Sequence, residues 1–449
     1  MAKDDTRTAT LPFGIVGVDL GTVKREIPAD EPPVWPVNAE LQVVGKPVER
    51  LDGRAKVTGA ARYSADVQLP GMLYAARFTS PVPHGRIKSI DTSAAERVPG
   101  VRAVHVLEQV RGSASLIDPE KGRQPKYPLL RYAGQPIGAV AATSQAVADE
   151  AAKLVKLEIE PLPFVAELDA AMKDDAPTVF SGAAVMGGSA GGGGGARDVP
   201  QQGNVRGPAR SSRGDVDAGL RAADVVVEGE YRTQVQTHSA LETHGVVADY
   251  KDDELTVYAS TQGTKTVREE LAHVFGVPKS RVRVITEFMG GGFGAKFGAG
   301  NAAVLAVHLS KKTKAPVRLM LSRKEEHLSV GNRPNSIMQV TIGAKKDGKL
   351  TAIRHVSHGT AGTGTGAGTS APARNMYECA NVLTEDYDVF TNAGPSTAFR
   401  APGHPQGCFS LEQSIDELAE RLGMDPLALR DRIDVDWDAF IDSDARRRE

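Results

Sequence analysis

The chain has 449 residues, which is enough for two or three domains that each bury a hydrophobic core. Lys and Arg total 54 against 56 Asp and Glu, so the net charge is −2 and there is no surplus of cations for nucleic-acid phosphates or anionic lipid. The two cysteines, Cys379 and Cys408, are too few for a disulfide framework or an iron–sulfur cluster within the chain.

Residues 1–40 are predicted to form an extended N-terminal arm. They contain EIPADEPPVWPVN, whose prolines exclude a helix or a central strand. The arm is either a loose leader or a strap over a partner. The first residues, MAKDDTRTAT, show no basic region followed by an apolar one, and the longest apolar stretches are about half of the roughly 20 residues that span a bilayer. We therefore expect a cytoplasmic protein without a membrane or nucleic-acid partner.

Residues 41–181 are predicted to form a small mixed domain. Apolar runs at 72–78 and 101–107 alternate with turn signals. A helical pattern at 145–157 places Ala148, Ala151 and Ala152 on one face, between strand-like segments at 136–143 and 157–161. The pattern indicates a strand–helix–strand unit.

Residues 182–214 are predicted to be a linker. They hold eleven glycines in 33 positions and few apolar side chains, so they cannot bury enough surface to offset the entropy of ordering.

Residues 215–449 are predicted to form an α+β domain with mixed sheets, because strand and helix patterns alternate irregularly. Helices are expected at 265–275, ending at Gly276, at 302–309, and at 411–422, ending at Gly423, with a further short helix from Pro426. Strands rich in β-branched residues are expected at 223–233, 255–261, 281–288, 316–322, 337–344 and 350–356.

A glycine cluster between a strand and a helix is the most informative segment. It comprises Gly290, Gly291, Gly292, Phe293 and Gly294. Glycines let main-chain N–H groups surround an anion near the positive end of a helix, and they also allow a tight turn for strand–helix packing. The GxGxxG and Walker patterns both fail here, which disfavours a nicotinamide-dependent Rossmann enzyme.

Three further segments carry polar side chains suited to chemistry. In HSALETHG, alternation on a strand would place His238, Glu242 and His244 on one face, where hydrogen bonding near a cofactor is favoured over metal ligation. Gln262, in STQG, can donate and accept hydrogen bonds, although Thr264 could instead simply cap a helix there. Arg400, in TAFRAPGH, precedes a helix and suits an oxygen ligand, or lies solvated on the surface.

Taken together, these segments resemble the molybdenum-binding subunit of the xanthine dehydrogenase and aldehyde oxidase family. The resemblance covers about residues 41–433 in ordered blocks: VVGKPVERLDGRAKVTGAARYSADVQLPGMLYAARF, RYAGQPIGAVAAT, HSALETHG, STQG, MGGGFGAKFG, RPNSIMQVTIG and TAFRAPGHPQG. It implies an α/β hammerhead domain at 41–181, followed by the first part of a molybdopterin-binding domain at 215–449.

The resemblance also implies a site. Gln262 would hydrogen-bond an oxo ligand of molybdenum, while Gly291, Gly292, Phe293 and Gly294 would lie beside the pterin and metal. Arg400 would lie close to substrate and metal, where a cation stabilises developing negative charge, and Ala401 and Gly403 would shape its loop. The implied cofactor is molybdopterin with molybdenum, with or without an attached cytosine dinucleotide, and [2Fe-2S] clusters and FAD on partner subunits would carry the electrons.

Two departures from the family pattern bear on the substrate. Purine-oxidising members carry a glutamate where this chain has Phe297, and a phenylalanine where it has Pro402. Carbon monoxide dehydrogenases carry a copper-binding cysteine at the position of Ala401. The resemblance therefore favours hydroxylation of an aldehyde or an N-heterocycle, with water as the oxygen source.

The family's catalytic base, a glutamate in a GxGE-type segment, has no counterpart in the sequence, and neither Glu242 nor Glu412 lies in such a motif. We expect the N-terminal half of a split large subunit, which works with a complementary C-terminal chain, a [2Fe-2S] subunit and an FAD subunit on a small-molecule substrate. The alternative is a truncated, non-catalytic fragment that binds cofactor or a partner.

Overall fold

The computed structural model describes residues 6–15, 18–28, 41–107, 126–180 and 199–434. The chain divides into two units, one formed by Met1–Ala61 with Val435–Glu449 and the other by Arg62–Asp434. Among the described residues, no helix is long and apolar enough to cross a membrane.

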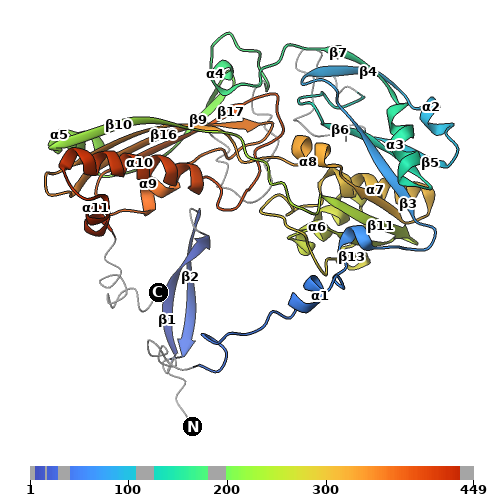
Figure 1. The fold of residues 1–449 in the computed structure, drawn as a ribbon, viewed down its shortest axis with the longest axis horizontal. Coiled ribbons are helices and arrows are strands. Elements are labelled where there is room, and N and C mark those ends of the chain that lie inside the picture. The colour runs from blue at the N-terminus through green and yellow to red at the C-terminus, as the bar shows by residue number, and fades with distance from the viewer. Residues whose placement is uncertain (1–5, 16–17, 29–40, 108–125, 181–198, 435–449) are drawn as a thin grey trace. The chain divides into compact units, whose positions relative to one another are not determined.

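The described part of the first unit consists of a hairpin and a short helix (Figure 1). Strand β1 (Thr6–Ile15) pairs antiparallel with β2 (Val18–Pro28), so these parts of the predicted arm are extended. Helix α1 (Gly53–Val57) follows, and Asp52, just before it, pairs with Arg50 and Lys56.

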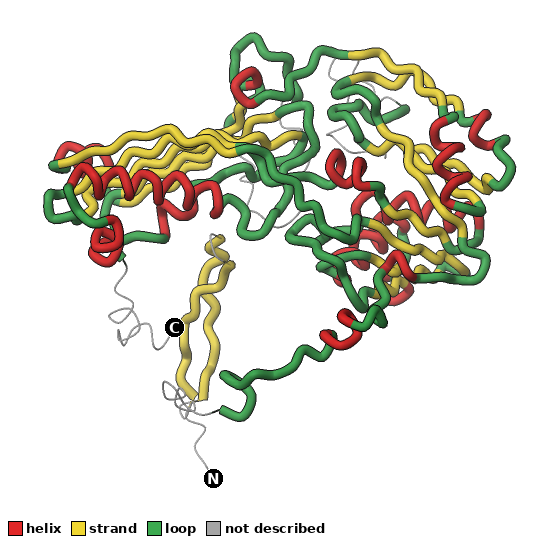
Figure 2. The backbone as a smooth tube through the Cα atoms, viewed as in Figure 1, coloured by secondary structure: helices red, strands yellow, loops and turns green. Residues whose placement is uncertain are grey.

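The second unit contains two mixed sheets, visible as separate groups of strands at the left and right of Figure 2. We call the first of them sheet A; its strand order is β13-β12-β11-β14-β3-β6-β5. It joins strands of the predicted hammerhead region to strands of the later region, because β14 pairs in parallel with β3. Its strands are β3 (Leu73–Thr79), β5 (Val101–Val106), β6 (Pro136–Ala142), β11 (Gly245–Lys251), β12 (Glu254–Ala259), β13 (Val282–Ile285) and β14 (Val317–Met320).

Helices α6 (Thr264–Phe275) and α7 (Gly300–Thr313) bury their apolar faces against sheet A. Leu271 on α6 and Leu305 and Leu309 on α7 are fully buried in the shared core. Helix α6 ends at Gly276 in the left-handed conformation, as its sequence predicts, and the 3-10 helix η3 (Lys279–Arg281) leads into β13.

The hammerhead region packs a second layer on β5 and β6. Strand β4 (Gly85–Asp91) pairs with β7 (Lys156–Pro161), and α3 (Gln145–Lys153) lies between β6 and β7 in the chain. This is the predicted strand–helix–strand unit, and Ala148, Ala151 and Ala152 are indeed its buried face. The remaining short elements are η1 (Ser64–Asp66), α2 (Ser93–Glu96) and α4 (Leu168–Ala171).

We call the other sheet sheet B; its strand order is β10-β15-β16-β17-β9-β8. Its strands are β8 (Gln201–Gln202), β9 (Val205–Arg213), β10 (Val225–Thr233), β15 (Ser336–Ala344), β16 (Leu350–Gly362) and β17 (Val382–Phe390). The predicted linker at 182–214 is wrong for β8 and β9, since β9 pairs antiparallel with β17; residues 181–198 lie outside the described residues. Backbone pairing with β17 orders β9 although most of its side chains are exposed.

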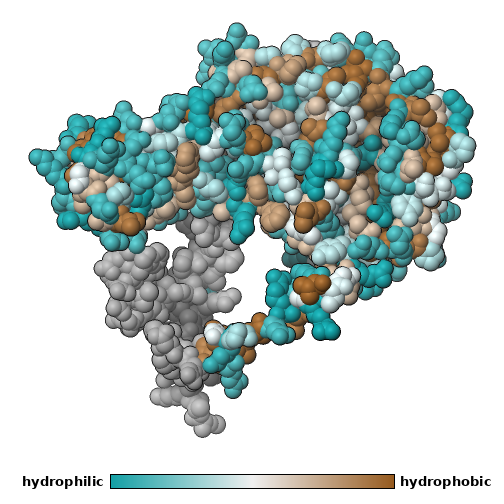
Figure 3. Space-filling view, viewed as in Figure 1, coloured by the Kyte–Doolittle hydropathy of each residue, from teal (hydrophilic) through white to brown (hydrophobic). Residues whose placement is uncertain are grey.

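Helix α10 (His404–Leu422) covers one face of sheet B, as Figure 1 shows, and α9 (Ala371–Asn375) and α11 (Pro426–Ile433) pack beside it. Leu411, Ile415 and Leu418 of α10 are fully buried there. Helix α5 (Val216–Ala222) contacts β15 and β16, and α8 (Arg323–Ser329) precedes β15 in the chain. On the visible face of this unit, apolar side chains are scattered among polar ones (Figure 3).

Candidate functional site

The side chain of Gln262 is held against the glycine cluster. Its Oε1 accepts hydrogen bonds from the main-chain N–H groups of Gly294 at 2.8 Å and Lys296 at 3.4 Å. The main-chain N–H of Gln262 donates to the carbonyl of Lys296 at 2.7 Å. Among the described residues, none accepts a hydrogen bond from its Nε2, and the residue is exposed. The amide is therefore fixed with its NH₂ group available to a ligand. The cap of α6 is Gly263, so the capping interpretation of Thr264 is wrong.

The glycine cluster forms a tightly packed loop. Gly291 and Gly294 have φ of +102° and +113°, which L side chains rarely adopt. A Cβ on Gly292 would lie 2.5 Å from Gln262 Oε1, and a Cβ on Gly294 would lie 2.2 Å from the carbonyl oxygen of Ala398. The glycines are therefore required by close approach of the backbone to its neighbours.

Donors on this loop remain available. Within the described residues, no group accepts a hydrogen bond from the main-chain N–H of Gly291, Gly292 or Phe293. Phe293 itself has φ of +53° and is 42% exposed. Of these three residues Gly292 is buried, so the N–H groups of Gly291 and Phe293, beside the exposed ring, are the ones suited to an anionic or oxygen-rich ligand.

The loop that carries Arg400 lies directly against the glycine cluster. The N–H of Arg400 donates to the carbonyl of Phe293 at 2.7 Å, and the rings of Phe293 and Phe399 have centroids 6.5 Å apart. Gly403 begins α10 with φ of +76°, and a Cβ there would lie 2.4 Å from the carbonyl of Gly368. The structure thus brings together Gln262, Phe293 and Arg400, which the sequence predicts as site residues.

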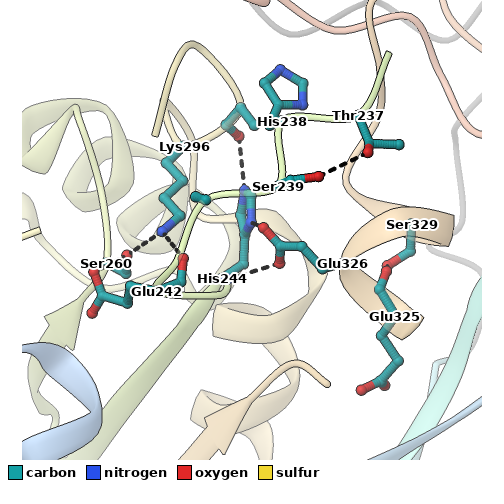
Figure 4. Close-up of polar contacts among 12 residues, drawn as sticks. Thr237, His238, Ser239, Glu242, His244, Ser260, Lys296, Glu325, Glu326 and Ser329 are labelled. Carbon is teal, nitrogen blue, oxygen red and sulfur yellow. Dashed lines mark hydrogen bonds and ion pairs between the residues drawn. The ribbon is translucent and has the colours of Figure 1, made fainter. Parts of the chain in front are cut away.

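A network of Lys296, Ser260 and Glu242, shown in Figure 4, contacts the glycine cluster at Gly290. The Nζ of Lys296, which is 1% exposed, donates to the carbonyl of Glu242 and to Ser260 Oγ, both at 2.7 Å. Ser260 Oγ donates to Glu242 Oε2 at 2.9 Å, and the same oxygen accepts from the N–H of Gly290 at 2.7 Å. Burial lowers the pKa of Lys296. Sequence reasoning missed this role of Lys296, although its place directly after the glycine cluster was a usable signal.

The expected strand through His238, Glu242 and His244 is wrong, because these residues lie in irregular structure before β11. His238 Nε2 donates to the carbonyl of Ala398 at 2.8 Å, whereas His244 contacts Glu326 Oε1 at 2.8 Å and the carbonyl of Ala295 at 3.0 Å. Burial lowers the pKa of His238. Among the described residues, no group of three or more His, Cys, Asp or Glu is arranged to hold a metal ion.

A cavity of about 380 Å³ lies next to this region. Ser260, Thr261 and Ala295 line it together with residues of α6 and the start of α7, but Gln262, Phe293 and Arg400 do not. The donors described above are therefore not part of the lining of this cavity.

The fold and the joined loops define a cofactor-binding class of protein. Residues 199–433 match the family described as "Molybdopterin cofactor-binding domain", and residues 58–163 match "Aldehyde oxidase and xanthine dehydrogenase, a/b hammerhead domain". The chain therefore belongs to the xanthine dehydrogenase and aldehyde oxidase family of molybdenum-binding subunits.

Individual relatives agree with this assignment. The chain is 34% identical to a probable xanthine dehydrogenase subunit of Bacillus subtilis, over 86% of this chain and 50% of that protein. It is 32% identical to the nicotinate dehydrogenase large molybdopterin subunit of Eubacterium barkeri, over 87% of this chain and 89% of that one. Quinoline 2-oxidoreductase of Pseudomonas putida 86 superimposes with a TM-score of 0.73 at 27% identity, covering 88% of this chain and 50% of that chain. The chain thus spans about half the length of most of these relatives.

Proposed function

We propose that the chain is the N-terminal half of a split molybdenum-cofactor subunit. In this proposal it forms part of a molybdenum hydroxylase that oxidises an aldehyde or an N-heterocycle with water as the oxygen source. The observation that carries the proposal is that hydrogen bonds to the glycine cluster join Gln262, through Gly294, and Arg400, through Phe293. The length match with the Eubacterium barkeri large molybdopterin subunit supports a separate chain of this size.

The residues present fit a molybdenum–dithiolene cofactor. The main-chain N–H groups of Gly291 and Phe293 have no acceptor among the described residues and can donate to oxygen or sulfur atoms. Gln262 Nε2 supplies a further fixed donor, and the exposed ring of Phe293 offers an apolar flat surface. When bound, such a cofactor supplies the two-electron oxidation chemistry.

This chain's side chains would orient and stabilise rather than carry electrons. Gln262 would hold an oxygen ligand through its NH₂ group, while the guanidinium of Arg400 would stabilise negative charge that develops on the substrate. Hydroxylation of a carbon adds one oxygen from water and releases two electrons and two protons. We propose that [2Fe-2S] and FAD subunits accept the electrons, and that a complementary C-terminal chain supplies the catalytic base.

We further propose a cytoplasmic assembly whose substrate is not a purine. What supports this is the family resemblance, in which purine-oxidising members carry glutamate and phenylalanine at the positions of Phe297 and Pro402, and carbon monoxide dehydrogenases a copper-binding cysteine at that of Ala401.

The test is to purify the native complex, measure its molybdenum, iron and flavin, and identify every polypeptide in it. The proposal expects molybdenum together with a second chain that carries a GxGE-type segment. A complex with that chain but no molybdenum would contradict the proposal, and a chain that purifies alone with neither would favour the truncated-fragment alternative.

A further inference from the structure

Arg333 is a buried cation that contacts the loop of Arg400 from within the protein. Its residue is 6% exposed and lies in the connection between α8 and β15. Its Nη2 donates to the carbonyl of Arg400 at 2.8 Å, and its Nη1 lies 3.5 Å from the carbonyl of Ala401 and 3.1 Å from Gln406 Oε1. The guanidinium carbon lies 4.6 Å from the ring centroid of Phe399. One side chain therefore contacts three successive residues of the loop.

The planar, forked shape of arginine is needed for this arrangement. A lysine has one compact ammonium group and cannot reach both carbonyls, the Gln406 amide and the ring face at once. Within the described residues, Arg333 forms no ion pair with a carboxylate. Its guanidinium donates instead to main-chain carbonyl oxygens and to the side-chain amide oxygen of Gln406. Removal of this side chain would leave those buried oxygens without their donor.

The loop that it contacts is strained. Arg400 and Ala401 have φ of +21° and +59°, although neither is glycine. Such conformations persist only where the surrounding structure holds them. The carbonyls on either side of Ala401's N–Cα–C unit are the ones that approach Arg333, so its guanidinium acts directly on the strained backbone.

The main chain of Arg333 is itself fixed. Its N–H and carbonyl exchange hydrogen bonds with Gln236 at 2.9 and 3.1 Å. Two residues beyond Gln236, the Nε2 of His238 donates to the carbonyl of Ala398, and the His238 ring lies 4.5 Å from that of Phe399. The side chain of Arg333 therefore contacts the Arg400 loop from a backbone position that is itself held by hydrogen bonds.

We propose that Arg333 is a positioning residue, which holds Arg400 and Ala401 in their left-handed conformation and thereby fixes the Arg400 backbone from which its side chain extends. Its importance for turnover rests on the proposed function, whereas its effect on the loop does not.

The experiment compares hydrogen–deuterium exchange in the full chain, within its native complex, for the wild type and for Arg333→Met, Arg333→Lys and Arg131→Met. Arg131 is a matched control, because it also stacks on a phenylalanine, Phe180, at 4.2 Å and donates to a carbonyl, that of Val179. Arg333→Met should accelerate exchange across 397–403 at least about tenfold, because it removes charged hydrogen bonds, and Arg333→Lys should lie between. Arg131→Met should leave that segment unchanged.

A rescue measurement separates positioning from general destabilisation. In Arg333→Ala, guanidinium ion at a non-denaturing concentration should restore slow exchange across 397–403, whereas tetramethylammonium should not. Unchanged exchange in Arg333→Met, or equal acceleration in Arg131→Met, overturns the proposal, and so does a failed rescue.

The same variants separate the two proposals. If the molybdenum complex forms, Arg333→Met should lower kcat at least about tenfold while molybdenum content stays that of the wild type. Fast exchange at 397–403 in a complex free of molybdenum would uphold the positioning role and reject the proposed function. Slow exchange at 397–403 in an Arg333→Met complex that contains molybdenum would reject the positioning role and uphold the proposed function.

Discussion

The main-chain N–H of Arg400 donates a 2.7 Å hydrogen bond to the carbonyl oxygen of Phe293. This bond joins the loop before α10, on sheet B, to the loop before α7, on sheet A. Gln262 is joined to the same glycine cluster through Gly294. Three segments that are distant in the sequence are therefore joined by hydrogen bonds to the glycine cluster. A substitution in one of them should alter the conformation or the amide exchange of the others.

Substitution of Gln262 should separate its two hydrogen-bonding roles. Gln262→Glu keeps an oxygen that accepts from Gly294 and Lys296, but it loses the NH₂ donor. We expect the thermal midpoint to stay within a few degrees of the wild type while turnover of the native complex falls at least about tenfold. Molybdenum content, melting and kcat measured on one preparation test this.

Gln262→Ala is the companion variant, since it removes both the acceptor and the donor. It should also destabilise the chain by about 1–2 kcal/mol, because two main-chain N–H groups lose their partner. If Gln262→Glu keeps full turnover, the exposed NH₂ group has no function in the reaction.

Arg400 should matter to turnover more than to assembly. Its side chain is exposed, whereas its main chain forms the bond to Phe293. Arg400→Ala should therefore lower kcat at least about tenfold with little change in subunit composition, since the proposed function places this cation near the substrate. Assembly is measured by gel filtration and turnover by steady-state kinetics. If the variant loses both to the same extent, Arg400 has a structural role and not a catalytic one.

Much of the fold is predictable because its signals are local. The ends of α6 at Gly276 and α10 at Gly423 follow from glycine's access to the left-handed conformation, and β15 follows from its β-branched residues. Strand β9 is not predictable in this way, because its sequence, VRGPARSSR, is polar and only pairing with β17 orders it.

The residues of the candidate site also divide into those that a local motif predicts and those that only tertiary contacts define. The glycine cluster, Gln262 and Arg400 are visible as motifs, and the structure brings them together. The environments of His238 and Arg333 depend on the distant residues Ala398 and Arg400, and no local pattern encodes such contacts. Alternation in HSALETHG predicts a strand, but tertiary hydrogen bonds hold this segment in an irregular path instead.

Gly294→Ala should disrupt the junction of the two loops. Its φ of +113° is unfavourable for alanine, and the added Cβ would lie 2.2 Å from the carbonyl of Ala398. Gly276→Ala is the matched control, because that glycine has φ of +63° but no atom within 4 Å of the added Cβ. The control should cost about 1–2 kcal/mol and Gly294→Ala distinctly more, with faster amide exchange at Arg400 only in the latter. Equal costs in urea unfolding would show that the close approach to Ala398 is easily relieved.

Lys296→Met should weaken the brace beneath the glycine cluster. The change removes the donor to the Glu242 carbonyl and to Ser260 Oγ in a fully buried position. We expect a loss of about 2–4 kcal/mol in the free energy of unfolding, because buried acceptors are left without their partner. The exposed Lys279, which pairs with Glu269 at the surface, provides the control Lys279→Met, expected to cost well under about 1 kcal/mol. A comparable midpoint for the two variants in urea would contradict the bracing role.

Stability should fall in mild acid through His355. This residue is fully buried; its Nε2 contacts Ser410 Oγ at 3.2 Å and its Nδ1 has no hydrogen-bond partner among the described residues. Burial lowers the pKa of His355 from its ordinary 6.5 to about 4, with Asp386 raising it and Arg374 lowering it. Between these values the unfolded chain binds more protons than the folded chain, so the free energy of unfolding must decrease as the pH falls from about 6.5 to about 4.

The size of this effect at pH 5 is about 2 kcal/mol for one such histidine, relative to pH 7. His105 adds to it in the same window, since burial, followed by His308 and Lys312, lowers the pKa of His105 to about 4 as well. His355→Gln should therefore reduce the slope of stability against pH without removing it, and the double variant with His105→Gln should reduce it further. Urea midpoints at pH 5, 6 and 7 measure all three proteins, and a slope that His355→Gln does not alter would mean that His355 gains its proton as readily in the folded chain as in the unfolded one.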